Sequence, residues 1–152
     1  MIYKNIIRKN NFISMIDSLM KIINDLNKEE AILVVEGKKD IEALRNFGFK
    51  GKILEYRQLL ESLHKEEYVK KFILLVDFDQ EGRKICKKLY NLLSVKGYKV
   101  DLYYWRKISE FKKYGLNEIE DIYSYLKNEW GWLNESNFNS QIYYRSQHRS
   151  RW

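Results

Sequence analysis

Two kinds of hydrophobic pattern alternate along the chain. Residues 11–27 place apolar side chains three and four positions apart, which predicts an amphipathic helix. Residues 31–35 and 72–76 are short unbroken runs of apolar, mostly branched side chains, typical of strands buried on both faces of a parallel sheet. Residues 52–56 give a weaker strand pattern, and residues 99–105 predict a further strand.

Segments with helical spacing separate these strands, at residues 41–47, 58–68 and 81–96. Gly48 and Gly97 follow the first and last of them, as expected at helix ends. Alternation of strand and helix predicts right-handed crossovers and a doubly wound parallel sheet, an α/β fold. One more helix is predicted at residues 117–128, and the chain after it is polar and aromatic without a clear period.

The patterns divide the chain into three parts. A core of residues 31–105 is preceded by a helical extension, residues 1–30, and followed by a helix with a basic aromatic tail, residues 106–152. Hydrophobic residues make up 45% of the chain, enough for a core without metal or disulfide support. Cys86 is the one cysteine, which excludes a disulfide framework and fits a reducing setting. No apolar stretch is long enough to span a membrane, so we expect a cytoplasmic protein.

The charge of the chain favours a polyanionic partner. The formal net charge is +7, and a basic surface attracts nucleic acid above all. Surplus lysine also keeps proteins soluble, and charge alone does not decide between the two explanations.

Acidic residues follow two of the predicted strands directly. Glu36 comes after the first run, and Asp77 and Asp79 come after the second. Because ligands of open parallel sheets bind beyond the carboxyl ends of the strands, we expect these side chains to meet there. Clustered carboxylates repel one another unless a hard cation such as Mg²⁺ lies among them. The alternative is that an aspartate only caps the following helix.

Glycines and cations accompany these acids. Gly37 and Gly82 each follow closely, and a glycine allows sharp turns and close approach of the backbone to a ligand. A helix beginning near Glu81 would direct its amides toward the same space, where a phosphate could bind. The candidate phosphate contacts are Lys38, Lys39, Arg83 and Lys84.

Residues 34–40, Val-Val-Glu-Gly-Lys-Lys-Asp, resemble the first motif of the Toprim family, and residues 75–82, Leu-Val-Asp-Phe-Asp-Gln-Glu-Gly, resemble the second. The resemblance implies a Rossmann-like, four-stranded parallel sheet with flanking helices, here with short helical extensions at both ends. By position, Glu36 corresponds to the family's general acid or base. Asp77 and Asp79 correspond to its Mg²⁺ ligands, for which Mn²⁺ can substitute.

Two further acids match the motifs less firmly. Glu81 corresponds to a third acidic position that varies among family members, and we include it among the expected metal ligands. Asp40 corresponds to an acid downstream of the first motif, where a helix-start or structural role is equally compatible.

The family includes topoisomerases, bacterial-type primases and nucleases, among them the ribonuclease that matures 5S ribosomal RNA. The chain resembles small stand-alone Toprim proteins and the core of that maturase. Metal-assisted phosphodiester hydrolysis needs the least additional protein, so we expect a Mg²⁺-dependent nuclease acting on RNA or DNA. The alternative is a non-catalytic nucleic-acid-binding subunit of a larger complex. With either activity we expect nucleic acid as the partner, bound by a homodimer or by a subunit of a nucleic-acid-processing complex. A nucleotide-handling protein is disfavoured because the chain lacks a phosphate-binding Gly-x-x-x-x-Gly-Lys-Ser/Thr loop.

Three other features have two interpretations each. Arg145 and Arg149 alternate with aromatic residues in the tail, which suits single-stranded nucleic acid but also describes a frayed terminus. The aromatic residues 103–105 are expected to fill core and edge space rather than stack on bases. Acids on the late helix could add to the acidic centre, but a solvated helix face is favoured; they are Glu118, Glu120 and Asp121.

Overall fold

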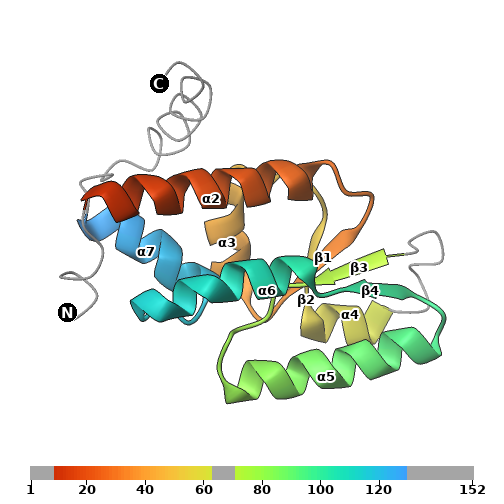
Figure 1. Ribbon diagram of the computed structural model, residues 1–152. Coiled ribbons are helices and arrows are strands. Elements are labelled where there is room, and N and C mark those ends of the chain that lie inside the picture. Colours follow the sequence, from red (N-terminus) through yellow and green to blue (C-terminus); the bar gives the residue numbers. More distant parts are fainter. Residues whose placement is uncertain (1–8, 63–70, 130–152) are drawn as a thin grey trace.

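The computed structural model describes residues 9–62 and 71–129 (Figure 1). Its strands are β1 (Ile32–Val35), β2 (Ile53–Glu55), β3 (Lys71–Leu74) and β4 (Lys99–Asp101). They form one parallel sheet in the order β2-β1-β3-β4, which confirms the predicted four-stranded α/β fold. The helices are α2 (Lys9–Asn27), α3 (Lys38–Asn46), α4 (Tyr56–Ser62), α5 (Gln80–Val95), α6 (Tyr103–Ser109), the 3₁₀ helix η2 (Glu110–Tyr114) and α7 (Ile119–Glu129).

Helices cover both faces of the sheet. In Figure 1, α4 and α5 lie below it, α2 and α3 lie above it, and α7 lies to its left. Successive side chains of a strand point to opposite faces, so β1 contributes to both cores. Ile32 and Val34 pack with α4 and α5, and Leu33 and Val35 pack with the helices of the other face. Burial on both sides explains why β1 is an unbroken apolar run.

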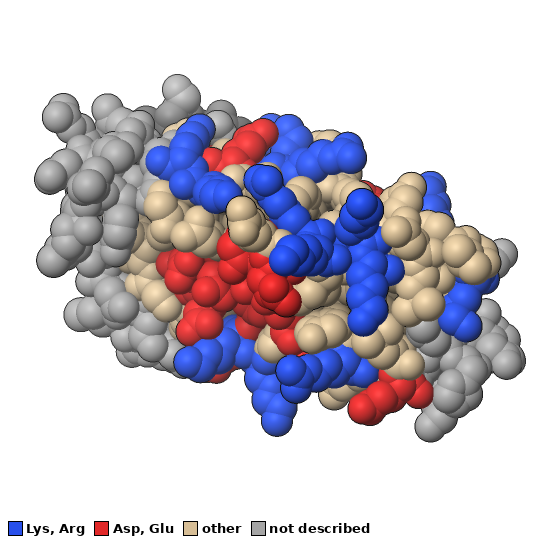
Figure 2. All heavy atoms as spheres, turned by 90° about the horizontal axis from the view of Figure 1, so that it is seen from below, with Lys and Arg blue, Asp and Glu red and all other residues tan. Residues whose placement is uncertain are grey.

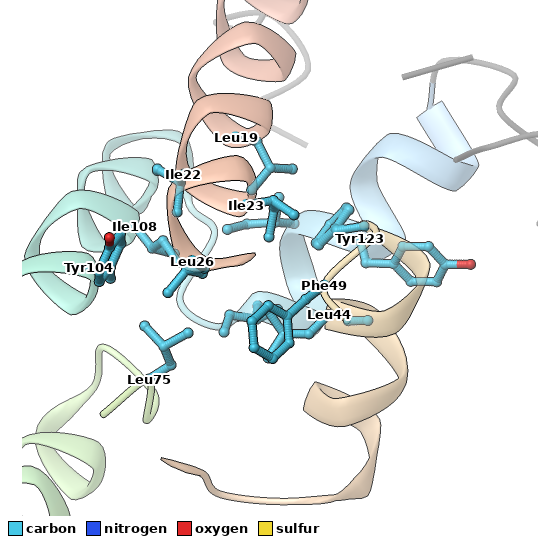
Figure 3. Packing of buried hydrophobic residues seen from close by; sticks show 14 of the residues in the cluster. Leu19, Ile22, Ile23, Leu26, Leu44, Phe49, Leu75, Tyr104, Ile108 and Tyr123 are labelled. Carbon is cyan, nitrogen blue, oxygen red and sulfur yellow. The ribbon is translucent and has the colours of Figure 1, made fainter. Parts of the chain in front are cut away.

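The amphipathic helix α2 is part of the larger core. Figure 3 shows its side chains directed toward apolar groups from α3, α6, α7 and the end of β3. The residues in contact there include Leu19, Ile23, Leu26, Leu44, Leu75, Ile108 and Tyr123. Within the described residues, no helix is both long and apolar enough to cross a membrane.

Glycines end α3 and α5 in the same way, as predicted. Gly48 has φ of 98° and Gly97 has φ of 87°, the left-handed region that favours glycine. The amide of Phe49 donates to the carbonyl of Leu44, and that of Tyr98 donates to Leu93, both at 3.0 Å. Each bond closes a helix end whose carbonyls would otherwise lack partners.

The predicted strand at residues 99–105 is wrong in its second half. β4 ends at Asp101, whose Oδ1 accepts a hydrogen bond from the amide of Tyr103 at 2.7 Å. This turn starts α6, in which Tyr104 and Ile108, four residues apart, are both buried. Tyr103 is 54% exposed, so it does not fill the core as expected. The predicted helix at residues 58–68 is described only as far as Ser62.

A charged network joins the sheet to its surroundings away from the acidic motifs. Lys71 at the start of β3 lies 2.7 Å from Glu29 and 3.1 Å from Asp101. The hydroxyl of Tyr104 donates to Glu29 at 2.9 Å. These bonds lower the pKa of Glu29 and raise that of Lys71, so both groups stay ionised.

Candidate metal centre

The acidic motifs meet because β1 and β3 are neighbours. Val34 pairs with Leu74, and the amide of Leu75 donates to the carbonyl of Val34 at 2.8 Å, which extends the pairing toward the acids. Glu36 and Asp77 follow these strands, and their carboxyl groups lie close enough for Glu36 to raise the pKa of Asp77. The structure therefore brings these two residues together at the carboxyl edge of the sheet.

Asp40 belongs to this centre and also starts a helix. Its Oδ2 accepts a hydrogen bond from the amide of Gly37 at 3.2 Å, which caps the start of α3. The side chain is 6% exposed, and its other oxygen, Oδ1, has no hydrogen-bond partner among the described residues. The same holds for Oε1 of Glu36. Buried polar atoms are normally paired, so two such carboxylate oxygens at one place indicate room for a ligand.

Another carboxylate of this site is that of Glu118, directly before α7. One oxygen each from Asp40, Asp77 and Glu118 lie within 4.8 Å of one another. The amide of Phe78 donates to the carbonyl of Asn117 at 2.9 Å, which ties the loop after β3 to the loop before α7. Asp77 and Glu118 are the chain neighbours of these two residues, so the bond holds their carboxylates close. We call Glu36, Asp40, Asp77 and Glu118 the acidic centre.

The interpretation of the late acids as a solvated helix face is thus wrong for Glu118. Ile119 and Ile122 are buried against α3, and their packing turns Glu118 toward Asp40. The sequence carried no signal for this, because the contact joins two helices far apart in the chain. Glu120 instead pairs with exposed Lys39 at 3.6 Å, and Asp121 accepts from the amide of Asn117 at 3.0 Å.

The other predicted ligands lie differently. Asp79 is the N-cap of α5, where its Oδ1 accepts from the amide of Gly82 at 2.7 Å. It is near enough for its charge to raise the pKa of Asp77. Glu81 is exposed in the first turn of α5. Neither is a member of the three-carboxylate group that Asp77 forms.

The acidic centre is electrostatically strained. Burial, the nearby carboxyl group of Glu36 and the charge of Asp79 raise the pKa of Asp77 to about 8. Burial and the charge of Asp77 raise the pKa of Glu118 to about 7 and that of Asp40 to about 6. No ion pair joins Asp40, Asp77 or Glu118 to any lysine or arginine within the described ranges. A divalent cation with oxygen ligands suits such a donor set.

The two motif glycines differ in what they do. At Gly82, which is buried, an added Cβ would overlap the backbone carbonyl of Asp77. Only glycine therefore lets α5 begin against that residue. Gly37 has φ of −149°, extended backbone that any residue adopts, and a Cβ there would meet nothing within 4 Å. The sharp turn expected at Gly37 is absent, and the missing side chain leaves open space beside Glu36.

Cations surround the acids on the surface. Figure 2 shows a compact group of acidic side chains bordered by lysine and arginine. The predicted phosphate contacts are all exposed, namely Lys38, Lys39, Arg83 and Lys84. The tail arginines, Arg145 and Arg149, lie outside the described residues.

Comparison with known proteins matches this arrangement to a family. The model of the Toprim domain matches residues 31–105. The UPF0292 protein TK1411 of Thermococcus kodakarensis is 32% identical over 116 residues, covering 71% of this chain and 84% of its own. The chain belongs to the Toprim family. Glu118, a member of the acidic centre of this Toprim protein, lies beyond residues 31–105, which the family model matches.

Other relatives agree with this assignment. The UPF0292 protein PF1724 of Pyrococcus furiosus is 36% identical over 110 residues, covering 68% of this chain and 79% of its own. A solved structure of a protein from Aquifex aeolicus is 33% identical, with a TM-score of 0.54, covering 66% of this chain and 94% of its own. The family and the acidic group together indicate a metal-binding function related to nucleic acid.

Proposed function

We propose that this Toprim protein is a Mg²⁺-dependent phosphodiester hydrolase that cleaves RNA or DNA. The observation that carries the proposal is the acidic centre itself. It gathers the buried carboxylate of Asp40 and half-buried carboxylates at the edge of the sheet without a compensating cation from the described side chains. Mg²⁺ prefers oxygen ligands and commonly uses carboxylates together with substrate phosphate, and Mn²⁺ can take the same place.

Asp77 and Glu118 would hold the ion, together with the free Oδ1 of Asp40. Asp79 is close enough to contribute through its charge while it caps α5. A bound divalent cation supplies charge stabilisation for the phosphate and lowers the pKa of a coordinated water. The chain itself must place the phosphate, exclude competing cations and move a proton.

Glu36 is suited to the proton transfer. Its carboxyl group lies beside that of Asp77, and its Oε1 is buried and has no hydrogen-bond partner among the described residues. Such an oxygen can accept a proton from an attacking water without first breaking a hydrogen bond. A Cβ at Gly37 would meet nothing within 4 Å, so the backbone next to Glu36 leaves space for a phosphate. The exposed lysines at the start of α3 and the helix amides there favour an anion at the same place.

The experiment is cleavage of labelled RNA and DNA, single-stranded and duplex, by the full chain with Mg²⁺, Mn²⁺ or EDTA. Asp77→Asn and Glu118→Gln should each lower the rate by roughly 100-fold or more, in the range expected for a lost catalytic group. The matched control is Glu120→Gln, on the same helix but paired with Lys39, which should keep the wild-type rate.

The result also separates hydrolysis from binding alone. A protein that never cleaves any of the substrates with either metal is not a nuclease. If such a protein still binds nucleic acid tightly, it is the non-catalytic binding module instead. Equal loss in Glu118→Gln and Glu120→Gln would remove Glu118 from the proposed site.

A further inference from the structure

An open pocket lies beside the acidic centre, between α5 and the start of α6. Its volume is about 320 Å³, which is within the roughly 300–1,000 Å³ of small-ligand sites. Its less exposed lining is apolar, formed by Leu102, the ring of Trp105 and the buried thiol of Cys86. The pocket therefore offers an apolar surface of the size that a flat ring system would cover.

The exposed lining of the pocket is basic and aromatic. Three cations contribute to it, Arg83, Lys87 and Arg106, and Tyr90 adds a ring that is 43% exposed. No acidic side chain is among the described residues that line it. Three cations around one opening repel one another unless an anion lies between them, and Tyr90 exposes apolar surface that a partner could cover. A nucleotide has both required parts, a phosphate and a flat aromatic base.

Two contacts connect this pocket to the acidic centre. The indole Nε1 of Trp105 donates to the carbonyl of Val76 at 3.0 Å, and its ring meets Phe78 edge-on with centroids 6.1 Å apart. Val76 and Phe78 are the chain neighbours of Asp77. Arg83 follows Gly82, whose backbone lies directly against Asp77. A strand with one phosphate at the acidic centre would thus reach the pocket with a neighbouring nucleotide.

We propose that this pocket binds an unpaired nucleotide of single-stranded nucleic acid, next to the phosphate held at the acidic centre. The base stacks on Tyr90 or Trp105, and Arg83, Lys87 and Arg106 contact the backbone phosphates. Bases inside a duplex are already stacked and cannot enter such a pocket, so the site selects single strands. This inference rests on the proposed function for its geometry but makes a separate claim about binding.

The test is fluorescence anisotropy with labelled 12-nucleotide single strands of RNA and DNA, in EDTA so that no cleavage occurs. Tyr90→Ala and Arg106→Gln should each weaken binding by roughly tenfold, the usual effect of losing one stacking or phosphate contact. Two matched controls lie outside the pocket. Tyr103→Ala removes another exposed tyrosine, and Lys88→Gln removes an exposed cation of α5 that does not line the pocket. Both should change affinity less than twofold.

The outcomes distinguish this inference from the proposed function. If the controls weaken binding as much as the pocket variants, or duplex binds as tightly as single strand, the pocket is not a nucleotide site. If free uridine monophosphate competes with the same affinity as the oligonucleotide, the proposal of a single-strand site is also overturned, since the ligand would then be a free nucleotide.

If the wild type never cleaves but Tyr90→Ala and Arg106→Gln lose binding, the hydrolysis proposal fails and the pocket proposal stands. If cleavage occurs with unchanged KM in both variants, hydrolysis stands and the pocket fails.

Discussion

At the scale of single residues, carboxylates in and beside the acidic centre use one oxygen for the fold. Oδ2 of Asp40, in the centre, accepts a hydrogen bond from the amide of Gly37, and Oδ1 of Asp79, beside it, accepts one from the amide of Gly82. When a hydrogen bond holds one oxygen of a carboxylate, the other oxygen has a nearly fixed position from which it can bind a ligand. The buried Oδ1 of Asp40 is such an atom. Helix capping and ligand binding are thus compatible roles of one side chain rather than alternatives.

The raised pKa values of Asp77, about 8, and Glu118, about 7, predict how pH affects stability. Both carboxyl groups hold protons more tightly in the folded chain than in the unfolded one, where their pKa values are near 4. The metal-free protein should therefore lose stability as pH rises from about 5 to about 8. Mg²⁺ competes with these protons, so its stabilising effect should grow over the same range.

Thermal denaturation across this pH range, in EDTA and in Mg²⁺, measures both effects. Asp77→Asn removes the group with the largest shift, so its stability should depend less on pH and on Mg²⁺ than that of the wild type. A metal-free protein that becomes more stable between pH 5 and pH 8 would contradict the sign of these shifts.

At the scale of elements, the acidic centre depends on how helices begin. α3 begins at Lys38, two residues after Glu36, α5 begins directly after Asp79, and α7 begins directly after Glu118. The ring of Tyr123 in α7 meets Phe47 edge-on at 5.6 Å, just after α3 ends, so these helices are packed together. Helix starts also carry unpaired amides and partial positive charge, which favours a centre rich in anions.

The start of α5 gives a direct test of this geometry. Gly82→Ala would place a methyl group on the backbone carbonyl of Asp77, which cannot move without displacing the loop after β3. We expect a loss of about 1–3 kcal/mol or more in the free energy of unfolding, as for overpacked positions. Gly37→Ala is the control, because its Cβ enters open space on extended backbone. Urea denaturation measures both, and equal losses would show that the close contact at Gly82 is unimportant.

The elements also show what the sequence could and could not predict. Apolar runs, helical spacing and glycine ends located most strands and helices, because burial imposes these patterns locally. The same rules failed at residues 99–105, where the aromatic run favoured a strand but Asp101 bonds the amide of Tyr103 and starts α6. They also failed for Glu118, since its place depends on α7 packing against α3. Glu36 and Asp77 were brought together as expected because neighbouring parallel strands align their ends.

At the scale of the whole molecule, charge of both signs is arranged around one site. The chain carries a net charge of +7, yet acidic side chains gather on one face, with cations around them (Figure 2). The surrounding cations attract nucleic acid, while the unneutralised carboxylates repel its phosphates. A divalent ion would reverse the local sign and let a phosphate approach.

This balance predicts opposite effects of one substitution in two solutions. In EDTA, at a pH above the Asp77 pKa of about 8, Asp77→Asn removes a negative charge that faces the phosphate, so it should bind single-stranded nucleic acid severalfold more tightly than the wild type. In Mg²⁺, the wild type should gain affinity and the variant should gain little, since the variant has lost a ligand of the ion. Anisotropy titrations at fixed ionic strength measure these affinities and separate the effect of Mg²⁺ at the acidic centre from general screening of charge by salt.

The control, Glu120→Gln, removes a charge that Lys39 already pairs, so its affinity should follow that of the wild type in both solutions. If Mg²⁺ changes the affinity of Asp77→Asn as much as that of the wild type, the ion acts on the nucleic acid and not at the acidic centre.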